Sequence, residues 1–286
     1  MKKVRKAIIP VAGLGTRFLP VTKSIPKEML PIVDTPTLQY IIEEAAAAGI
    51  EEILLITKWN KGCIEDHFDT NYELESILER DGKFKELVLV KTPSRLVKLY
   101  YIRQDEPKGS GHAINIGRSF VGAEPFAVLY GDDLMYSTEE PVLKQLINDY
   151  EETGANVIGT KEVTESEVSR YGMIKFKNEY TRQIDTIVEK PSVGEQPSLV
   201  AGLGRYVVRS TIFDCLDRIS TGAGGEYQFT DAMKMLMETE DFYACNIDGT
   251  YYDTGSKIGY LKANIDFALR RPELKDELTK YINELK

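Results

Sequence analysis

The chain alternates apolar, strand-like segments with helical ones over its first 160 residues, and this alternation restricts the folds open to it. Residues 4–11 (VRKAIIPV) and 52–57 (EILLIT) have the length and apolar character of buried strands. Between them, residues 37–48 (TLQYIIEEAAAA) have a helical pattern that ends at Gly49. A strand, a helix and a strand at this spacing predict a right-handed crossover between two parallel strands.

The alternation continues beyond these three elements. Further strands are expected at residues 99–103, 125–130 and 155–160, and further helices at 111–120 and 140–152. Repeated βα units of this kind predict an α/β chain with a Rossmann-like, mixed but mainly parallel sheet that is flanked by helices.

After about residue 165, short β-like segments lie between turn signals, and no long helix separates them. The segments at 173–177, 184–189 and 200–208 predict a small antiparallel β extension. Helical patterns return at 228–238 and 257–269. Because no repeat or low-complexity linker interrupts the sequence, we expect one composite domain.

The last segment, residues 273–285, is amphipathic. Its apolar side chains Leu274, Leu278, Ile282 and Leu285 recur at intervals of three and four. This helix is expected either to close the sheet or to pair with another subunit.

Charge and cysteine content exclude several classes of protein. The net charge of −9 argues against a general binder of nucleic acids or anionic membranes, because both ligands require a positive field. The three cysteines are odd in number and far apart, so we expect buried thiols in a reducing, cytoplasmic compartment. No apolar run approaches the ~20 residues that a membrane span needs.

A glycine-rich turn, residues 12–17 (AGLGTR), follows the first strand. Glycines let successive backbone N–H groups approach a phosphate at the carboxyl end of a strand. Arg17, Lys23 and Lys27 add three cations to an otherwise acidic chain, as a polyphosphate ligand would require. A tight turn with solvated basic side chains is the alternative, and the spacing alone leaves both open.

Two common phosphate-binding motifs are absent. A dinucleotide fingerprint needs a third glycine where this chain has Phe18. The nearest match to a Walker A loop, residues 154–161 (GANVIGTK), has Thr and Lys in reversed order and lies in a predicted strand. A Rossmann dehydrogenase and a P-loop ATPase are therefore not supported.

Two further segments carry charged pairs. Gly131-Asp132-Asp133 follows an apolar strand, where carboxylates suit a hard divalent cation, although a polar turn would look the same. In Glu189-Lys190-Pro191 the proline disfavours helix, so Lys190 is expected in an extended turn, and a solvated surface pair is the alternative.

Residues 7–49 closely resemble the opening of bacterial UTP–glucose-1-phosphate uridylyltransferases, also called UDP-glucose pyrophosphorylases. The G-x-G-T-R core is general to sugar-nucleotide pyrophosphorylases, whereas residues 20–34 (PVTKSIPKEMLPIVD) are more particular to this branch. The resemblance covers essentially the full chain in the expected order. Further matches lie at residues 103–104, 109–113, 131–133, 171–172, 189–191, 204–206, 226–232 and 253–255.

The resemblance implies an enzyme that transfers a uridylyl group from UTP to α-D-glucose 1-phosphate. The products would be UDP-glucose and pyrophosphate, formed by direct in-line attack with Mg²⁺. It implies a single nucleotidyltransferase domain over residues 1–286, with a nucleotide-binding core at 1–165, a sugar-binding part at 166–255 and C-terminal helices at 256–286. Relatives are commonly dimers or tetramers, so a homo-oligomer is expected.

The resemblance also implies roles for individual residues. Asp132 and Asp253 would hold the metal, although Asp253 also suits an Asx turn before the next helix. The catalytic cations would be Arg17, Lys27 and Lys190. Nucleotide-binding roles fall to Ala12, Gly13, Gly15, Glu28, Gln104, Gly109 and Asp133, and sugar-binding roles to Gly172, Glu189 and Lys190. Among these, the amide of Gln104 would read the uracil edge, because an amide both donates and accepts hydrogen bonds.

One segment departs from the family pattern. Relatives often have an Asn where this chain has Leu199, and Gly202 is an extra flexible position. This departure concerns how glucose is held and not the nucleotide chemistry. An enzyme that uses dTTP or another sugar phosphate, and a non-catalytic paralogue that binds UDP-sugar, are the two rival interpretations.

Overall fold

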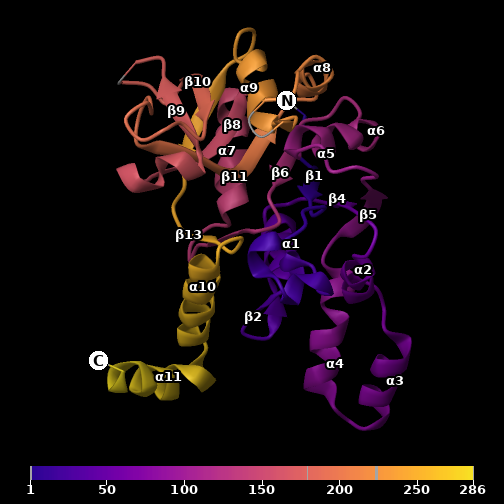
Figure 1. Ribbon diagram of the computed structural model, residues 1–286. Helices are drawn as coiled ribbons and strands as arrows, with labels where there is room; N and C mark the ends of the chain where they lie inside the picture. Colours follow the sequence, from indigo (N-terminus) through magenta and orange to yellow (C-terminus); the bar gives the residue numbers. More distant parts are fainter. Residues whose placement is uncertain (1, 179, 223–224, 286) are drawn as a thin grey trace.

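The computed structural model describes residues 2–178, 180–222 and 225–285, and a nine-stranded sheet within those residues forms its centre (Figure 1). Along its main path the strands are β10 (Ile184–Glu189), β9 (Gly172–Phe176), β11 (Val200–Val208), β6 (Phe126–Leu129), β1 (Lys6–Pro10), β4 (Glu52–Thr57) and β5 (Lys98–Arg103). Strand β8 (Asn156–Glu162) pairs with β11, and β12 (Phe242–Asn246) pairs with β8.

The pairing divides the sheet into two parts. Strands β6, β1, β4 and β5 are parallel, as the alternating pattern predicts. Strand β11 pairs antiparallel with β6, β8 and β9, and β9 pairs antiparallel with β10. The expected α/β fold and its antiparallel extension are both confirmed.

Helices cover both faces of the sheet. Because side chains alternate along a strand, the neighbours Ile8 and Ile9 of β1 enter opposite cores. One core contains the apolar sides of α1 (Thr37–Ala47) and α7 (Val142–Thr153). The other contains those of α5 (Ser110–Ile116), α8 (Ile212–Leu216) and α9 (Phe229–Leu236).

Two sequence predictions are corrected here. The single helix expected at 111–120 is two helices, α5 and α6 (Arg118–Val121), which meet at Gly117. A Cβ at Gly117 would lie 2.4 Å from the side chain of Ile8, so the break lets the backbone approach the sheet. The strand expected at 155–160 is present as β8, but it joins the sheet between β11, to which it is antiparallel, and β12, to which it is parallel, and not beside the strands of the parallel series.

Several elements were not predicted. Three helices between β4 and β5, α2 (Gly62–Phe68), α3 (Tyr72–Arg80) and α4 (Phe84–Lys91), are largely exposed. Two small sheets pair β2 (Pro31–Ile32) with β3 (Thr35–Pro36) and β7 (Asp133–Tyr136) with β13 (Thr250–Asp253). Short 3₁₀ turns complete the chain: η1 (Thr16–Phe18), η2 (Val21–Lys23), η3 (Lys27–Met29), η4 (Pro93–Arg95) and η5 (Glu165–Arg170).

The C-terminal helices project from the body of the molecule (Figure 1). Helix α10 (Lys257–Arg270) packs Ala263 and Phe267 against Ile32, Leu134 and Tyr252. None of the described residues of α11 (Pro272–Glu284) is buried. The alternative in which the last helix closes the sheet is therefore wrong.

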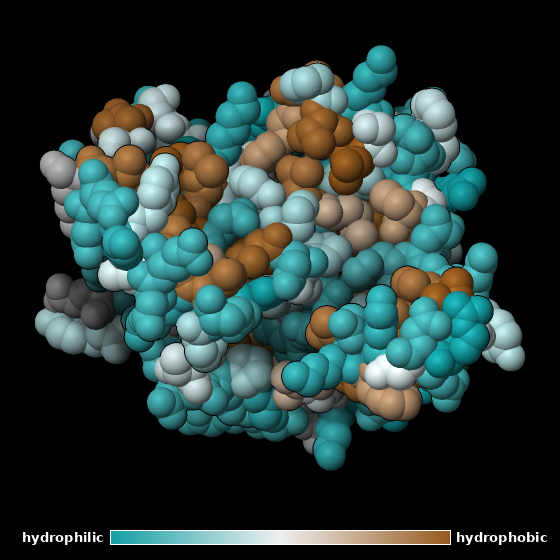
Figure 2. Space-filling model, turned by 90° about the horizontal axis from the view of Figure 1, so that it is seen from below, coloured by the Kyte–Doolittle hydropathy of each residue, from teal (hydrophilic) through white to brown (hydrophobic). Residues whose placement is uncertain are grey.

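From the end of the molecule opposite the sheet, the surface is mostly hydrophilic with separate hydrophobic patches (Figure 2). Exposed apolar side chains include Phe84, Val88 and Leu89 of α4. Among the described residues, no helix has the length and apolar character required to cross a membrane.

Candidate active site

The glycine-rich turn leaves β1 and folds back over Lys27. Gly15 has a φ of 66°, which favours glycine, and its carbonyl accepts a 2.7 Å hydrogen bond from the Thr22 hydroxyl. A Cβ at Gly13 would lie 3.5 Å from the Lys27 side chain. Lys27 and Arg17 therefore come from one locally ordered turn.

The third cation of this segment has a different environment. Lys23 lines a separate cavity of about 320 Å³, together with Lys58 and Trp59. Arg17 instead faces the carboxylates, and its guanidinium lies 3.5 Å from the carbonyl of Gly255.

Lys27 and Asp132 form a close ion pair. The Nζ of Lys27 lies 2.5 Å from Oδ2 of Asp132. Burial alone would lower the pKa of Lys27, but the carboxylates of Asp132, Glu28 and Asp133 outweigh it and raise that pKa. Burial likewise opposes ionisation of Asp132, yet Lys27 and Arg17 keep its pKa below the usual value. The pair is charged in the folded protein.

Asp132, Asp133 and Asp253 concentrate negative charge at one end of the cavity. Asp253 pairs with Asp133 in the β7–β13 ladder. Burial, together with the charges of Asp132 and Asp253, raises the pKa of Asp133 to about 7, although the Tyr251 hydroxyl donates a 2.9 Å hydrogen bond to it. A buried excess of carboxylates is the environment that a cation would stabilise.

The two predicted metal ligands converge at Gly255. A Cβ at this position would lie 2.5 Å from Oδ2 of Asp132 and 3.1 Å from Oδ1 of Asp253. The two carboxylate oxygens therefore border the same small space, which a side chain at residue 255 would fill.

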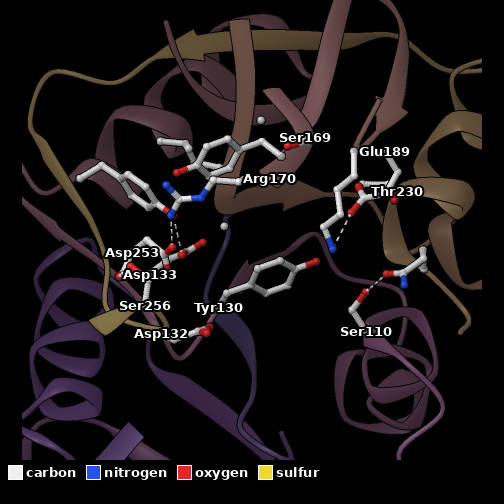
Figure 3. Close-up of a pocket in the computed structure, with 18 of the residues that line it drawn as sticks. Ser110, Tyr130, Asp132, Asp133, Ser169, Arg170, Glu189, Thr230, Asp253 and Ser256 are labelled. Atoms are coloured by element: carbon white, nitrogen blue, oxygen red, sulfur yellow. Dashed lines mark hydrogen bonds and ion pairs between the residues drawn. The ribbon is translucent and has the colours of Figure 1, made fainter. Parts of the chain in front are cut away.

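Arg170 pairs with one of these two carboxylates. At the end of η5, its guanidinium donates to Oδ2 of Asp253 and lies 5.5 Å from the ring of Tyr171 (Figure 3). Arg170 was not predicted from the sequence. Its only local signal is its place directly before the Tyr171-Gly172 match.

Glu189, Lys190 and Gly172 form the other end of the cavity. Gly172 of β9 pairs with Glu189 of β10, and a Cβ at Gly172 would lie 3.2 Å from Oε2 of Glu189. The Nζ of Lys190 lies 3.4 Å from Oε1 of Glu189. The extended turn expected at Lys190 is wrong: its φ is 45°, and its N–H donates to the Tyr171 carbonyl, which fixes the chain direction before Pro191.

These groups surround a cavity of about 630 Å³ (Figure 3). Tyr130, Ser110 and Thr230 also line it; Ser110 and Thr230 lie within the matched segments 109–113 and 226–232, but neither was assigned a role from the sequence. The structure brings seven of the predicted site residues to this cavity: Arg17, Asp132, Asp133, Gly172, Glu189, Lys190 and Asp253. Gly202 lines it too, whereas Leu199 is exposed and does not.

The remaining predicted residues lie outside the lining of that cavity. Glu28 is buried and paired at 2.9 Å with Lys61, which also donates to the Val11 carbonyl. A Cβ at Gly109 would lie 2.5 Å from the Tyr227 carbonyl, so this glycine is required by packing within the protein. Lys27 does not line the cavity, but its ammonium group is paired with Asp132, which does. The others in this group are Ala12, Gly13, Gly15 and Gln104.

The site therefore combines a glycine turn, paired cations and a carboxylate cluster at the carboxyl ends of β1 and β6. The nucleotidyl transferase family profile matches residues 6–269, and the chain belongs to that family.

Its relatives agree on the branch within this family. The UTP–glucose-1-phosphate uridylyltransferase of Staphylococcus haemolyticus is 52% identical over 287 residues, covering 100% of this chain and 99% of the relative. The second such enzyme of Staphylococcus saprophyticus is 51% identical, with the same coverage. The structure is similar to a UTP-bound UGPase from Acinetobacter baumannii, with a TM-score of 0.91, 40% identity and coverage of 99% of this chain and 100% of that chain. The branch expected from the sequence is confirmed.

Proposed function

We propose that this enzyme transfers a uridylyl group from UTP to α-D-glucose 1-phosphate, releasing UDP-glucose and pyrophosphate. Its relatives at about 50% identity carry that activity in their names, over the full length. The observation that carries the proposal is the convergence of Asp132 and Asp253 at Gly255, in a cavity with cations at both ends. Two phosphate-bearing substrates would require positive charge at both ends of the cavity and a place for a cation between them.

Mg²⁺ is the proposed cofactor, held by Asp132 and Asp253. Among the described residues, no group of three or more His, Cys, Asp or Glu side chains is arranged to hold a metal ion. Two carboxylates nevertheless fit Mg²⁺, which usually takes one or two from the protein and completes its shell with phosphate oxygens and water. When bound, the ion would neutralise charge on the phosphates.

The proposed reaction needs no general base. A phosphate oxygen of glucose 1-phosphate, already anionic near neutral pH, forms a bond to the α-phosphorus of UTP. The bond from that phosphorus to the bridging oxygen breaks, and pyrophosphate leaves with the electron pair. The protein supplies alignment and positive charge, through Arg17 and Lys27 beside the triphosphate and Lys190 beside the sugar phosphate.

The other predicted site residues are assigned roles according to whether they lie in the nucleotide-binding core or in the sugar-binding part. Ala12, Gly13, Gly15, Gln104 and Gly109 lie in the core assigned to the nucleotide, where Glu28 would act by holding Lys61 and the turn in place. Asp133 would stand beside the bound nucleotide.

In the sugar-binding part, Glu189 would accept hydrogen bonds from glucose hydroxyls. Gly172 would leave room for the glucose ring beside Glu189, because a side chain at residue 172 would contact the Glu189 carboxylate.

Two further expectations, about self-association and the cellular compartment, are also proposals. Self-association is supported by the exposed apolar side chains Tyr281 and Leu285 at the C-terminal end, and light scattering of the purified protein tests it. Cys215 and Cys245 are buried as expected, whereas Cys63 is exposed, so the expectation of buried thiols is wrong for that residue. A reducing, cytoplasmic compartment is supported by the free state of all three.

Pyrophosphate release with UTP, Mg²⁺ and glucose 1-phosphate tests the proposed reaction. We expect release only when all three are present, and UDP-glucose as the second product. Preference for dTTP, or for another sugar phosphate at equal concentration, would replace the substrate assignment with the rival one.

A further inference from the structure

Gln104 follows β5 and has one side-chain partner among the described residues, a histidine. The residue is 4% exposed, and its backbone N–H donates to the Thr57 carbonyl at 2.7 Å. Its Nε2 lies 2.6 Å from Nδ1 of His112. Its Oε1 accepts no hydrogen bond from the described part of the chain.

The chemistry of the two groups fixes the direction of this hydrogen bond. An amide NH₂ can only donate, so Nδ1 of His112 must accept, and the imidazole is neutral with its proton on Nε2. Burial lowers the pKa of His112, with Lys108 acting in the same direction and Glu106 opposing it. The acceptor state is therefore the stable one near neutral pH.

The backbone around His112 is held rigidly by the segment that precedes α9. The N–H of Gly111 donates to the Tyr227 carbonyl at 2.8 Å, and the Tyr227 N–H donates to the Lys108 carbonyl at 2.8 Å. Gly109 packs against the same backbone. His112 can therefore act as a fixed reference point for the Gln104 amide.

We propose that His112 is a positioning residue that locks the Gln104 amide in the orientation that matches uracil and rejects cytosine. This inference rests on the proposed function, and on the uracil-reading role of Gln104 that the family resemblance implies. One hydrogen of the amide NH₂ points away from Oε1 and is used by His112. The other hydrogen and Oε1 lie side by side, and they complement the carbonyl and N3–H of the uracil imide.

Cytosine presents the reverse pattern, an acceptor at N3 beside an amino donor. To pair with it, the amide would have to rotate by 180°, which would place Oε1 against the lone pair of Nδ1. A buried acceptor facing another acceptor loses one hydrogen bond and gains a repulsion. The 5-methyl group of thymine lies on another edge, so this lock does not separate UTP from dTTP.

The test compares UTP with CTP in the unaltered enzyme and in His112→Gln. A glutamine at position 112 can donate or accept, so both orientations of Gln104 become possible. We expect the ratio of kcat/KM for UTP to that for CTP to fall about 10- to 100-fold, the effect of one unsatisfied buried polar group. The matched control is His67→Gln, because His67 also bonds a glutamine, Gln39, at 2.8 Å, but on α2 and away from the site. This control should leave the ratio unchanged.

A double-mutant cycle separates positioning from a merely structural role. In a Gln104→Leu background, His112→Gln should not change the UTP to CTP ratio further. In the unaltered enzyme, the ratio should also fall once the pH is taken below the lowered pKa of His112, because a protonated Nδ1 donates and reverses the amide. This measurement needs no variant and so holds even where a substitution prevents folding.

The possible results separate the role of His112 from the uridylyl transfer on which it depends. An enzyme that makes UDP-glucose, with an unchanged nucleotide ratio in His112→Gln, overturns the role of His112 alone. An enzyme that uses neither UTP nor CTP with glucose 1-phosphate overturns the proposed function, and the inference with it.

Discussion

The two ends of the cavity carry similar charges but bury them differently. The nucleotide wall, defined here as Lys27, Asp132 and Asp133, backs onto the enclosed Glu28–Lys61 pair, whose side chains are 1% and 6% exposed. On the sugar wall, defined as Gly172, Glu189 and Lys190, the Lys190 side chain is 54% exposed. The Lys27 side chain is only 20% exposed.

This difference has an energetic consequence. A charge in a poorly solvated wall interacts strongly with its partners, whereas water screens a charge on an open wall. The nucleotide wall is thus preorganised before substrate arrives, and the sugar wall can adapt its side chains to a phosphate that moves during the reaction. Equivalent substitutions should therefore have larger effects on the nucleotide wall.

The largest effect is expected for Asp132→Asn. Asparagine has nearly the same shape but is a poor Mg²⁺ ligand, so kcat should fall about 1,000-fold, or about 4 kcal/mol, with little change in thermal stability. Steady-state rates over a Mg²⁺ titration measure this. The exposed Asp185→Asn on β10 is the control, and near-normal rates for Asp132→Asn would remove Asp132 from the metal site.

Lys27→Ala should follow, with a loss of about 100-fold in kcat/KM for UTP, or about 2.7 kcal/mol, because a buried, charge-assisted contact disappears. Lys23 is on the same segment but does not line the main cavity, so Lys23→Ala should lose much less than Lys27→Ala. Equal losses in the two variants would mean that the turn acts through its general charge and not through the position of Lys27.

The parallel half of the fold was predictable because its signals are local. Strand β4 was predicted with its observed bounds, since a continuous apolar run between turn signals needs no distant partner to be recognised. Helices α2 to α4 were missed because each is only seven to nine residues long and most of their surface is exposed. Strands β7 and β13 are four residues each and exist only because they pair across more than one hundred residues.

The same contrast applies to the site. The cations of the turn and the carboxylates were predictable as residue types, but their meeting at Gly255 depends on the register that sets Asp253 opposite Asp133. Arg170 was missed because nothing nearby in the sequence shows that it reaches Asp253. The left-handed backbone of Lys190 also results from a contact with Tyr171 that is distant in sequence.

On the sugar wall, Lys190→Ala should reduce kcat/KM for glucose 1-phosphate about tenfold, or about 1.4 kcal/mol, because solvent screens this exposed cation. If the contact strengthens as the transition state forms, kcat should fall together with kcat/KM, while KM for UTP stays nearly constant. Lys175→Ala is the matched control, since Lys175 is an equally exposed lysine in an ion pair on the same β9–β10 hairpin. A defect confined to UTP would place Lys190 on the wrong wall.

The smallest effect tests whether the nucleotide wall stores unfavourable charge. Asp133 has a folded-state pKa of about 7, above its ordinary value of 3.8, so the folded protein binds more protons there than the unfolded chain between these pH values. The free energy of unfolding should therefore decrease as pH rises from 4 to 7 and remain lower above 7. Asp133→Asn keeps an oxygen to accept from Tyr251 but cannot ionise, so it should add about 1 kcal/mol to the stability at pH 8 and nothing at pH 4. Urea denaturation with EDTA and without nucleotide measures both values, with Asp185→Asn as the control. Equal gains at the two pH values would show that the stabilisation comes from packing, and the nucleotide wall would then differ from the sugar wall in burial but not in electrostatic strain.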